Sequence, residues 1–545
     1  MISKIFLFND LLIMISYYTS MNNNLQMVYT YHNETKHSQQ RYARSLGYMD
    51  WATQPDPYRI YFNTKKTKLA LSFENNTLEY SQIFQKQKDK SLCAPLCIES
   101  ISQFFQFSLG LAAIKEYSDQ SWALRCNASS GNLQPSEAYI LSSQIQGIEN
   151  GLHHYSVKEH ELEQLSKAPE LELPKNSFAV CLSSIVWREA WKYGERSWRY
   201  TQLDCGHALK ALEISASILG WKIQIVNTKD SQLKKLLGLD QTNRYIKEER
   251  ELADMLILIS FDDSNIDTND INLEEIQSKL QEEYDGKANQ LSLSWHKWDI
   301  LEKIEDSTLS DDLEKKKFIN TKYEENTCRK PSFLAKEVVL KRRSAQMMNE
   351  NDCTISKKEF ETIIGSVKSS ASSVHLVIFV HSVEELDSGL YILLRNKEHK
   401  EQLQTLLKED FLWERVDTNA GELYKLQDGD FKFLAKAISC NQDIAKDGAF
   451  SLGMLCEFMN QLETYGPSKY KQLYWECGAI GQQLYLETTS LQLSATGIGC
   501  FLDDILHDTI GLKTNHFQSL YHFTIGRGLV DSRLTTKEPY KKGEN

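Results

Sequence analysis

One short basic segment has the residue types that bind a phosphate group. Residues 341–346 (KRRSAQ) place two permanent cations and a hydroxyl at the end of a helical pattern. A guanidinium matches two phosphate oxygens at once, and a neighbouring serine can donate a third hydrogen bond. Because a lone Arg-Arg pair is more often a solvated helix face, this segment indicates a phosphate site only together with other segments.

Two further segments have the residues to contact a flat polar ligand. The turn 127–135 (NASSGNLQP) combines hydroxyls, amides, a glycine and a proline, and it can present side-chain and backbone donors, although an ordinary surface turn has the same composition. Segment 495–501 (ATGIGCF) follows a helical stretch, and its glycines let the backbone approach a ligand closely. It is not a dinucleotide-binding fingerprint, because it lacks a third glycine opening a helix.

The sequence has none of the common motifs for a nucleophile, a catalytic zinc or a nucleotide triphosphate. GxSxG, HExxH and the P-loop are all absent from it. We therefore assign no catalytic side chain and expect no metal.

The elements that would position these segments occur twice. The stretches 193–219 and 465–491 align without a gap at a constant offset, and Asp204 faces Glu476 in the alignment. Because there are only two copies with a long period, each should be a whole domain rather than a solenoid unit. The pairs Gly151-Leu152 and Gly389-Leu390 are related by a shorter offset, which predicts extra sequence in the second copy near 397–433.

Composition favours a globular chain that does not bind nucleic acid. The 545 residues are 41% hydrophobic and 10% aromatic, which suffices for full cores. A net charge of -12 spread along the chain argues against nucleic acid and anionic membranes as partners. Eleven scattered cysteines fit a reduced, cytoplasmic protein, and no uninterrupted apolar run of about 18 residues predicts a membrane span.

Short β runs alternate with helical stretches in both halves, which indicates an α+β fold. We predict an N-terminal extension over 1–28 that is disordered, with Met21 or Met27 as an alternative start. A first domain follows over 29–265, and a second domain covers 331–545. Between them, the acidic region 266–330 reads as a charged linker with one or two exposed helices.

Together these segments resemble the FMN-dependent nitroreductase-like flavoproteins, in particular the SagB-type dehydrogenase branch in a tandem, two-lobe form. The resemblance runs from about Tyr29 to Tyr540 and rests on YGERSWRYTQLDCGHAL, ASSGNLQP, RRS, ATGIGCF and HFTIGRGLVDSRLTT. It implies two lobes of that α+β fold, FMN as the cofactor, and a site built across a subunit interface.

The resemblance also assigns individual residues to the cofactor. It implies contacts to the FMN phosphate from Arg342, Arg343, Ser344 and Arg533, with Gln346 where the family often has a basic residue. It places Ile498 and Gly499 beside the flavin, and it places Ser129, Ser130 and Asn132 on the turn that reaches the flavin from the partner subunit. The chain departs from the family at Ala128, where Pro is usual, and at Asp531, where a cation is common.

The two copies keep different parts of this site. The first copy has the polar turn but carries 91–95 (SLCAP) where Arg-Arg-Ser would stand. The second has Arg-Arg-Ser and GIG but carries 366–371 (SVKSSA) instead of the turn. We therefore predict an intramolecular pseudo-dimer, a monomer with one competent FMN site and one degenerate site.

The implied activity is that of an FMN-dependent oxidoreductase in which hydride moves through flavin N5, so the protein supplies position and hydrogen bonds. Two substrate classes fit, a peptide azoline that is dehydrogenated or a small nitro or quinone compound that is reduced. The alternative is a degenerate fold of this family that acts as a non-catalytic binding or scaffold protein.

Overall fold

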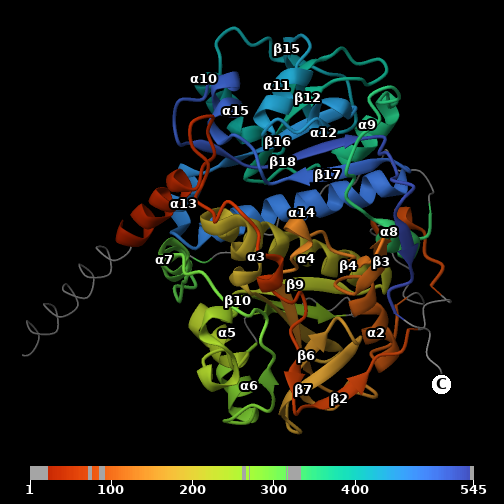
Figure 1. Ribbon diagram of the computed structural model, residues 1–545, viewed down its shortest axis with the longest axis vertical. Coiled ribbons are helices and arrows are strands. Elements are labelled where there is room, and N and C mark those ends of the chain that lie inside the picture. The colour runs from red at the N-terminus through yellow and green to blue at the C-terminus, as the bar shows by residue number, and fades with distance from the viewer. Residues whose placement is uncertain are drawn as a thin grey trace, which may run out of the picture.

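The computed structural model describes residues 22–71, 76–84, 93–260, 266–268, 271–314, 316 and 333–540. They form two lobes, each built on a seven-stranded sheet and covered by helices (Figure 1). This confirms the α+β fold and the arrangement of two lobes as a pseudo-dimer within one chain.

The sheet of the first lobe has the strand order β2-β7-β6-β5-β8-β10-β9. Every residue of β5 and β8 is buried, because helices and the second lobe cover both faces. Its strands are β2 (Lys65–Lys68), β5 (Ser136–Ser142), β6 (Gly151–Ser156), β7 (Glu161–Lys167), β8 (Ser177–Ser184), β9 (Lys222–Val226) and β10 (Leu252–Ser260).

The second lobe repeats this order as β14-β15-β13-β12-β16-β18-β17. Its centre is the apolar strand β12, VHLVIFV, which pairs antiparallel with β13 and β16. Its strands are β12 (Val374–Val380), β13 (Gly389–Leu394), β14 (Glu414–Arg415), β15 (Glu422–Asp428), β16 (Phe450–Glu457), β17 (Ser494–Ile498) and β18 (Phe517–Gly526).

Corresponding elements keep the two offsets read from the sequence. Strands β5 and β6 recur at the shorter offset as β12 and β13, and α4 (Ser197–Ile218) recurs at the longer offset as α14 (Lys469–Ser490). The expected extra sequence is confirmed between β13 and β16. It forms β14 and three helices, which are α10 (Lys400–Leu406), α11 (Lys432–Ile438) and α12 (Ile444–Asp447).

The long helices α4 and α14 pack against each other where the lobes meet (Figure 1). A Cβ atom at Gly206 would lie 2.2 Å from the carbonyl oxygen of Trp475, and one at Gly478 would lie 2.1 Å from that of Leu203. Leu203 and Trp475 are themselves aligned positions of the two copies, so the crossing has pseudo-two-fold symmetry. The repeated glycine, Gly206 and Gly478, is therefore explained by close contact of two helix backbones.

The remaining helices cover the sheets. Helix α9 begins with a capping box in which Ser356 and Glu359 satisfy each other's backbone N–H groups. These helices are α2 (Ile98–Gln106), α3 (Val186–Tyr193), α5 (Asp230–Leu236), α8 (Ala335–Lys341), α9 (Lys357–Gly365), α13 (Met459–Tyr465) and α15 (Asp503–Ile510). Within the described part of the chain, none of the helices has the length and apolar character needed to cross a bilayer.

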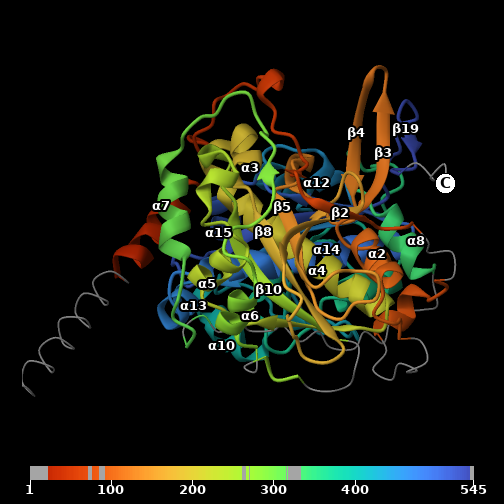
Figure 2. The same cartoon turned by 90° about the horizontal axis from the view of Figure 1, so that it is seen from below.

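Both ends of the second lobe lie on the first. Helix α8 buries Ala335, Val338 and Val339 in a cluster that contains Phe107 and Ile214 of the first lobe. Strand β19 (Thr535–Lys537) pairs with β3 (Leu111–Tyr117), which forms a hairpin with β4 (Gln120–Arg125). Figure 2 shows this hairpin projecting from the body of the molecule with β19 beside it.

The predicted disorder of the N-terminal extension is wrong for residues 22–28, which belong to a helical stretch over 22–34. Val28 and Tyr31 are fully buried, and Tyr31 packs edge to face against Trp198 of one lobe and Tyr470 of the other. Because Trp198 and Tyr470 belong to different lobes, both contacts of Tyr31 form only when the two lobes are packed together. Residues 1–21 lie outside the described part of the chain.

The region predicted as a charged linker is in part a layer of the first lobe. Helix α6 (Leu273–Lys279) buries Leu273 and Ile276, and β11 (Lys287–Ala288) pairs with β1 (Tyr61–Phe62). Helix α7 (Asp299–Thr308) buries Ile304 in the largest core cluster. The helices are amphipathic rather than exposed all round, because most of their acidic residues occupy the outer faces. Residues 269–270, 315 and 317–330 lie outside the described part.

Candidate functional site

Arg342 lies between the lobes with its guanidinium buried. It follows α8, which docks on the first lobe, and its Nε and Nη2 donate to the carbonyl oxygens of Cys126 and Arg125 at 2.8 and 3.1 Å. The guanidinium also lies 5.1 Å from the ring centre of Tyr485 on α14. Its remaining nitrogen, Nη1, is buried and has no hydrogen-bond partner among the described residues. Because such a donor costs free energy when it is left unpaired, Nη1 is suited to an incoming acceptor.

Arg343 adds a second cation beside the first. Its Nη1 donates to the carbonyl oxygens of Leu340 and Arg342, and its Nη2 donates to that of Ala112 in the first lobe at 3.2 Å. Burial lowers the pKa of both arginines, Arg342 lowers that of Arg343 further, to about 10, and no carboxylate of the described residues contributes to either shift. Two adjacent cations, one buried and one half-buried, without an acid beside them make this place suited to an anion. The donor set therefore fits a phosphate.

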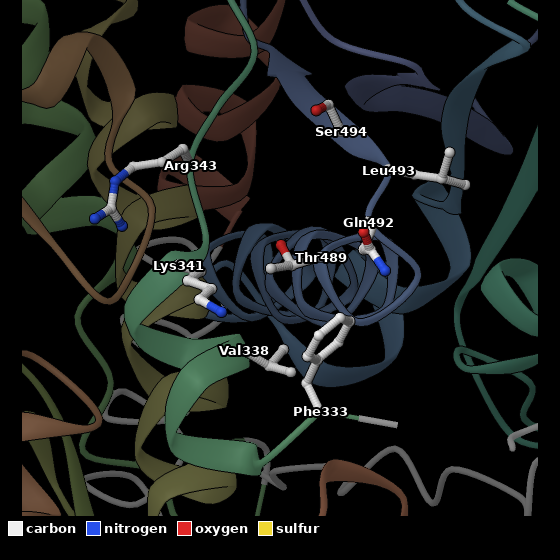
Figure 3. A pocket seen from close by; sticks show the side chains of 8 residues that line it. All are labelled: Phe333, Val338, Lys341, Arg343, Thr489, Gln492, Leu493 and Ser494. Atoms are coloured by element: carbon white, nitrogen blue, oxygen red, sulfur yellow. The ribbon is translucent and has the colours of Figure 1, made fainter. Parts of the chain in front are cut away.

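Two lysines extend the positive charge. Burial, followed by the charge of Arg343, lowers the pKa of Lys115 on β3, and Lys341 at the end of α8 is exposed. Beside them is a pocket of about 350 Å³, lined by Phe333, Val338, Lys341, Arg343, Thr489, Gln492, Leu493 and Ser494. Figure 3 shows the Arg343 guanidinium directed away from Thr489 and Gln492, which agrees with its hydrogen bond to the first lobe. The pocket thus borders the arginine pair.

Ser344 is connected to the glycine segment through Tyr485. The Ser344 hydroxyl and the Tyr485 hydroxyl share a hydrogen bond of 2.8 Å, and Gly497 N donates to the same Tyr485 oxygen at 2.8 Å. An isolated parallel bridge also joins Ser344 to Ala495. One tyrosine of α14 therefore holds two of the predicted segments together.

The polar turn of the first lobe is held by Asp204 of α4. Ser130 donates its backbone N–H at 3.0 Å and its hydroxyl at 2.9 Å to the Asp204 carboxylate. Burial raises the pKa of Asp204 to about 7, although hydrogen bonds from Ser129 and Ser130 lower it. Asn132 donates to the Ala123 carbonyl oxygen at 2.9 Å, which fixes the turn to β4. The turn begins directly after Cys126, the acceptor of Arg342, so it starts at the lobe interface.

Two tyrosines of the first lobe connect this turn to the glycine segment of the second. A Cβ at Gly131 would lie 2.6 Å from the Tyr193 hydroxyl, and the Tyr193 and Tyr200 rings are 4.5 Å apart. A Cβ at Gly499 would lie 2.3 Å from Tyr200, whose hydroxyl donates to the Gly499 carbonyl oxygen at 3.2 Å. The two tyrosine rings therefore occupy the space between the turn and the glycine segment.

Ile498 faces a small apolar cluster instead of the turn. It is 3% exposed and packs with Met348, Ile444 and Ala445. Its side chain anchors the end of β17, while the backbone of Gly499 is the part of this segment that reaches the first lobe.

The structure does not bring Arg533 to the arginine pair. Arg533 is exposed, pairs with Asp531 at 2.7 Å, and lies 5.4 Å from the ring centre of Tyr117 at the tip of the β3–β4 hairpin. Arg343 contacts Ala112 near the other end of β3, about 17 Å away along an extended strand. Gln346 is exposed on the segment after Ser344.

Sequence reasoning missed Asp204, Tyr485 and Tyr200 as parts of this site. Asp204 had a usable signal, because an acid stands at the aligned position Glu476 in the second copy. Tyr485 carries no signal in one sequence, since its role depends on which segments α14 passes in the fold.

The pseudo-equivalent position around Glu476 is closed by a buried arginine. Arg395 is completely buried, donates to the Val367 carbonyl oxygen at 2.6 Å and to the Ser372 hydroxyl at 2.5 Å, and lies 3.5 Å from Glu476. Its charge has an acid beside it, whereas no described carboxylate pairs with Arg342 or Arg343.

Comparisons with known proteins agree with the two-lobe architecture. A family model described as the nitroreductase family matches residues 119–247 and 339–527, more than half of the chain. A crystal structure from Anabaena variabilis ATCC 29413 described as a nitroreductase is 19% identical, covers 92% of this chain and 99% of its own, and has a TM-score of 0.64. No curated protein matches.

Two other solved structures match one part of the chain with low TM-scores and support no further argument. A nitroreductase structure from Ralstonia eutropha JMP134 is 13% identical, covers 39% of this chain and 97% of its own, and has a TM-score of 0.27. The E. coli microcin synthetase McbBCD complex is 18% identical, covers 46% of this chain and 96% of its own, and has a TM-score of 0.26. Because the family model matches one region in each lobe and more than half of the whole, this chain belongs to the nitroreductase family.

Proposed function

We propose that the chain is an FMN-dependent oxidoreductase with a single flavin site between its lobes. When bound, FMN supplies hydride transfer through its N5 atom. The chain's own residues bind the phosphate, orient the ring and exclude water, so no acid–base pair is needed beside the substrate.

The arginine pair carries this proposal. Arg342 offers a buried N–H that has no partner among the described residues, and Arg343 offers a second positive charge that no described acid neutralises. A phosphate dianion would supply the missing acceptor and the missing charge together. Ser344 would add its hydroxyl, which Tyr485 holds in place.

At the ring end, the two lobes contribute opposite sides. Ser129, Ser130 and Asn132 belong to the rigid turn of the first lobe, and Gly499 belongs to the second lobe. Tyr193 and Tyr200 lie between them and would shield the ring from solvent. Asp204 acts on the site indirectly, because it positions the turn through Ser130.

We propose one site rather than two because neither half of the second site is kept. Arg395 is buried beside Glu476, the aligned counterpart of Asp204, and has Glu476 and Ser372 as partners where the second lobe would need a polar turn. The first lobe also has Cys93-Ala94-Pro95 close to the place of Arg-Arg-Ser.

Membership in the nitroreductase family supports a nitro or quinone compound as the substrate, and the sequence resemblance to SagB-type enzymes supports a peptide azoline. The purified, FMN-loaded chain should be tested on both classes. Consumption of a nitroarene or quinone with a reduced nicotinamide donor supports the first, and conversion of an azoline peptide to the azole supports the second.

The decisive experiment is titration of FMN into the apoprotein, followed by flavin absorbance and fluorescence. We expect one FMN per chain, and Arg342→Ala should weaken binding by about 10- to 100-fold, since a hydrogen bond to a charged group contributes about 1.5–3 kcal/mol. Arg533→Ala is the matched control and should change the dissociation constant by less than about 2-fold, because Arg533 is exposed and paired with Asp531.

Two results would refute parts of this proposal. Binding of two FMN per chain would refute the single site, and unchanged binding in Arg342→Ala would refute the arginine clamp. A protein that stays colourless and binds no FMN at all would support the scaffold alternative.

A further inference from the structure

Two cysteines from different segments meet beside the glycine segment. Cys500 directly follows Gly499, and Cys440 lies in the turn after α11 with a positive φ of 52°. Their sulfur atoms are 2.8 Å apart and share a hydrogen bond. A disulfide needs about 2.05 Å between the sulfurs, so they have to approach by only about 0.8 Å.

The pair is accessible, which distinguishes it from the other close pair in the described residues. Cys440 and Cys500 are both half-buried. Cys456 and Cys477 also lie close, at 3.4 Å, but both are completely buried and out of reach of a dissolved reagent. Exposure as well as proximity is required for thiol chemistry with a small molecule.

The surroundings assign different states to the two sulfurs. The hydrogen bond with Cys440 is the largest cause that lowers the pKa of Cys500, and His37 and Arg196 lower it further against the effect of burial. The same hydrogen bond raises the pKa of Cys440, and burial raises it further. Arg196 is held close by, with its guanidinium 4.8 Å from the Phe501 ring centre. The directions of the two pKa shifts favour deprotonation of Cys500 over deprotonation of Cys440.

We propose that Cys440 and Cys500 form a thiol–disulfide exchange site for small-molecule disulfides of the glutathione kind. The Cys500 thiolate attacks one sulfur of the disulfide RSSR, a Cys500–S–S–R bond forms, and the thiolate RS⁻ leaves. Cys440 then attacks Cys500, its proton passes to the second leaving thiolate, and a Cys440–Cys500 disulfide remains. The two protein sulfurs are oxidised, and RSSR is reduced to one RS⁻ and one RSH; the RS⁻ then takes from water the proton that Cys500 had released to it.

Oxidation would tie the turn after α11 to the end of β17. A weaker link already exists there, because the Gln442 side chain donates to the Cys500 carbonyl oxygen at 3.2 Å. The N-terminal segment contacts the pair from one side, since His37 N donates to Asp503 and the Tyr42 hydroxyl interacts with Cys440.

The test uses the full chain and oxidised glutathione, with alkylation of the remaining thiols and peptide mass mapping. In the wild type, the peptides of Cys440 and Cys500 should become linked, with a mass two hydrogens lower, and dithiothreitol should reverse the change. Cys440→Ser should trap a glutathione adduct on Cys500, at least about 10-fold faster than on the half-buried Cys97. Cys97→Ser is the control variant and should leave the linkage unchanged.

Each outcome decides the proposal. It is overturned if Cys440 and Cys500 stay fully alkylated in the treated wild type, or if the Cys440→Ser variant gains no adduct on Cys500 faster than on Cys97. The wild-type mapping needs no variant, so a variant that folds poorly leaves the test intact.

Discussion

Replacement of Asp204 by Asn should make the stability of the protein less dependent on pH. In the native chain the Asp204 carboxylate is 1% exposed, and it accepts hydrogen bonds from the Ser130 N–H and hydroxyl and from the Ser129 side chain. No cation of the described residues is among the causes that set its pKa, and burial raises that pKa from 3.8 to about 7. The charged form is therefore held at a cost in free energy.

The magnitude and sign follow from linkage. One unit of pKa corresponds to about 1.4 kcal/mol, so the charged Asp204 destabilises the fold by at most about 4 kcal/mol above pH 7. Between about pH 4 and pH 7 the folded chain keeps a proton that the unfolded chain has lost, so this group lowers stability as pH rises. Asn is neutral at every pH. Asp204→Asn should therefore match the wild type near pH 4 and be more stable above pH 7.

The assay is urea unfolding of the apoproteins at pH 5 and pH 8, because bound FMN would add its own stabilisation. The variant's advantage over the wild type, measured as the difference between their free energies of unfolding, should increase by about 2–4 kcal/mol from pH 5 to pH 8. Asp230→Asn is the control: Lys471 and Lys316 lower the pKa of Asp230 against the effect of burial, so the group titrates below pH 5, and this variant should be less stable than the wild type by an almost constant amount between pH 5 and pH 8. A difference for Asp204→Asn that does not change with pH would refute the reasoning.

Two further substitutions test the interface. Gly478→Ala should lower Tm by several degrees, because a Cβ 2.1 Å from the Leu203 oxygen forces α4 and α14 apart. The cost of this separation exceeds the ~1 kcal/mol that alanine gains in helix propensity. An unchanged or higher Tm would contradict the crossing geometry. Tyr485→Phe should weaken FMN binding by about 5- to 10-fold in titration with little change in Tm. The substitution removes the hydroxyl that forms hydrogen bonds with Ser344 and Gly497, each of which contributes about 1 kcal/mol. Full affinity would show that the Tyr485 hydroxyl does not position Ser344 for the phosphate.

The duplication could be predicted because helix contacts leave a periodic trace in the sequence. The equivalent helices α4 and α14 keep the same glycine, since both backbones need the same close approach. The acidic region 266–330 was harder to interpret. Its acidic residues, most of which lie on the outer faces of α6 and α7, outnumber the few apolar residues that these helices bury. The helix over 22–34 packs on both lobes, so its order has no local cause.

The segments of the candidate site could be predicted from the sequence, but only some of their positions in the fold could. The sequence indicated which segments carry hydrogen-bond donors, and the fold places Arg342 on the carbonyl of Cys126, next to the polar turn. Arg533 lies just before the C-terminal strand that pairs with β3, and pairing register alone puts it at the far end of the hairpin. A register of this kind is not encoded in the residue types of one short strand.

The residue types and their spacing establish that there are two related lobes, that their copies are unequal, and that Arg-Arg-Ser belongs to one and the polar turn to the other. The folded chain adds that no described acid pairs with these arginines, that Arg395 has Glu476 beside it, and that Asp204 and Tyr485 hold the site. Residue types fix the available charges and donors, whereas pairing and burial depend on contacts between residues far apart in the chain.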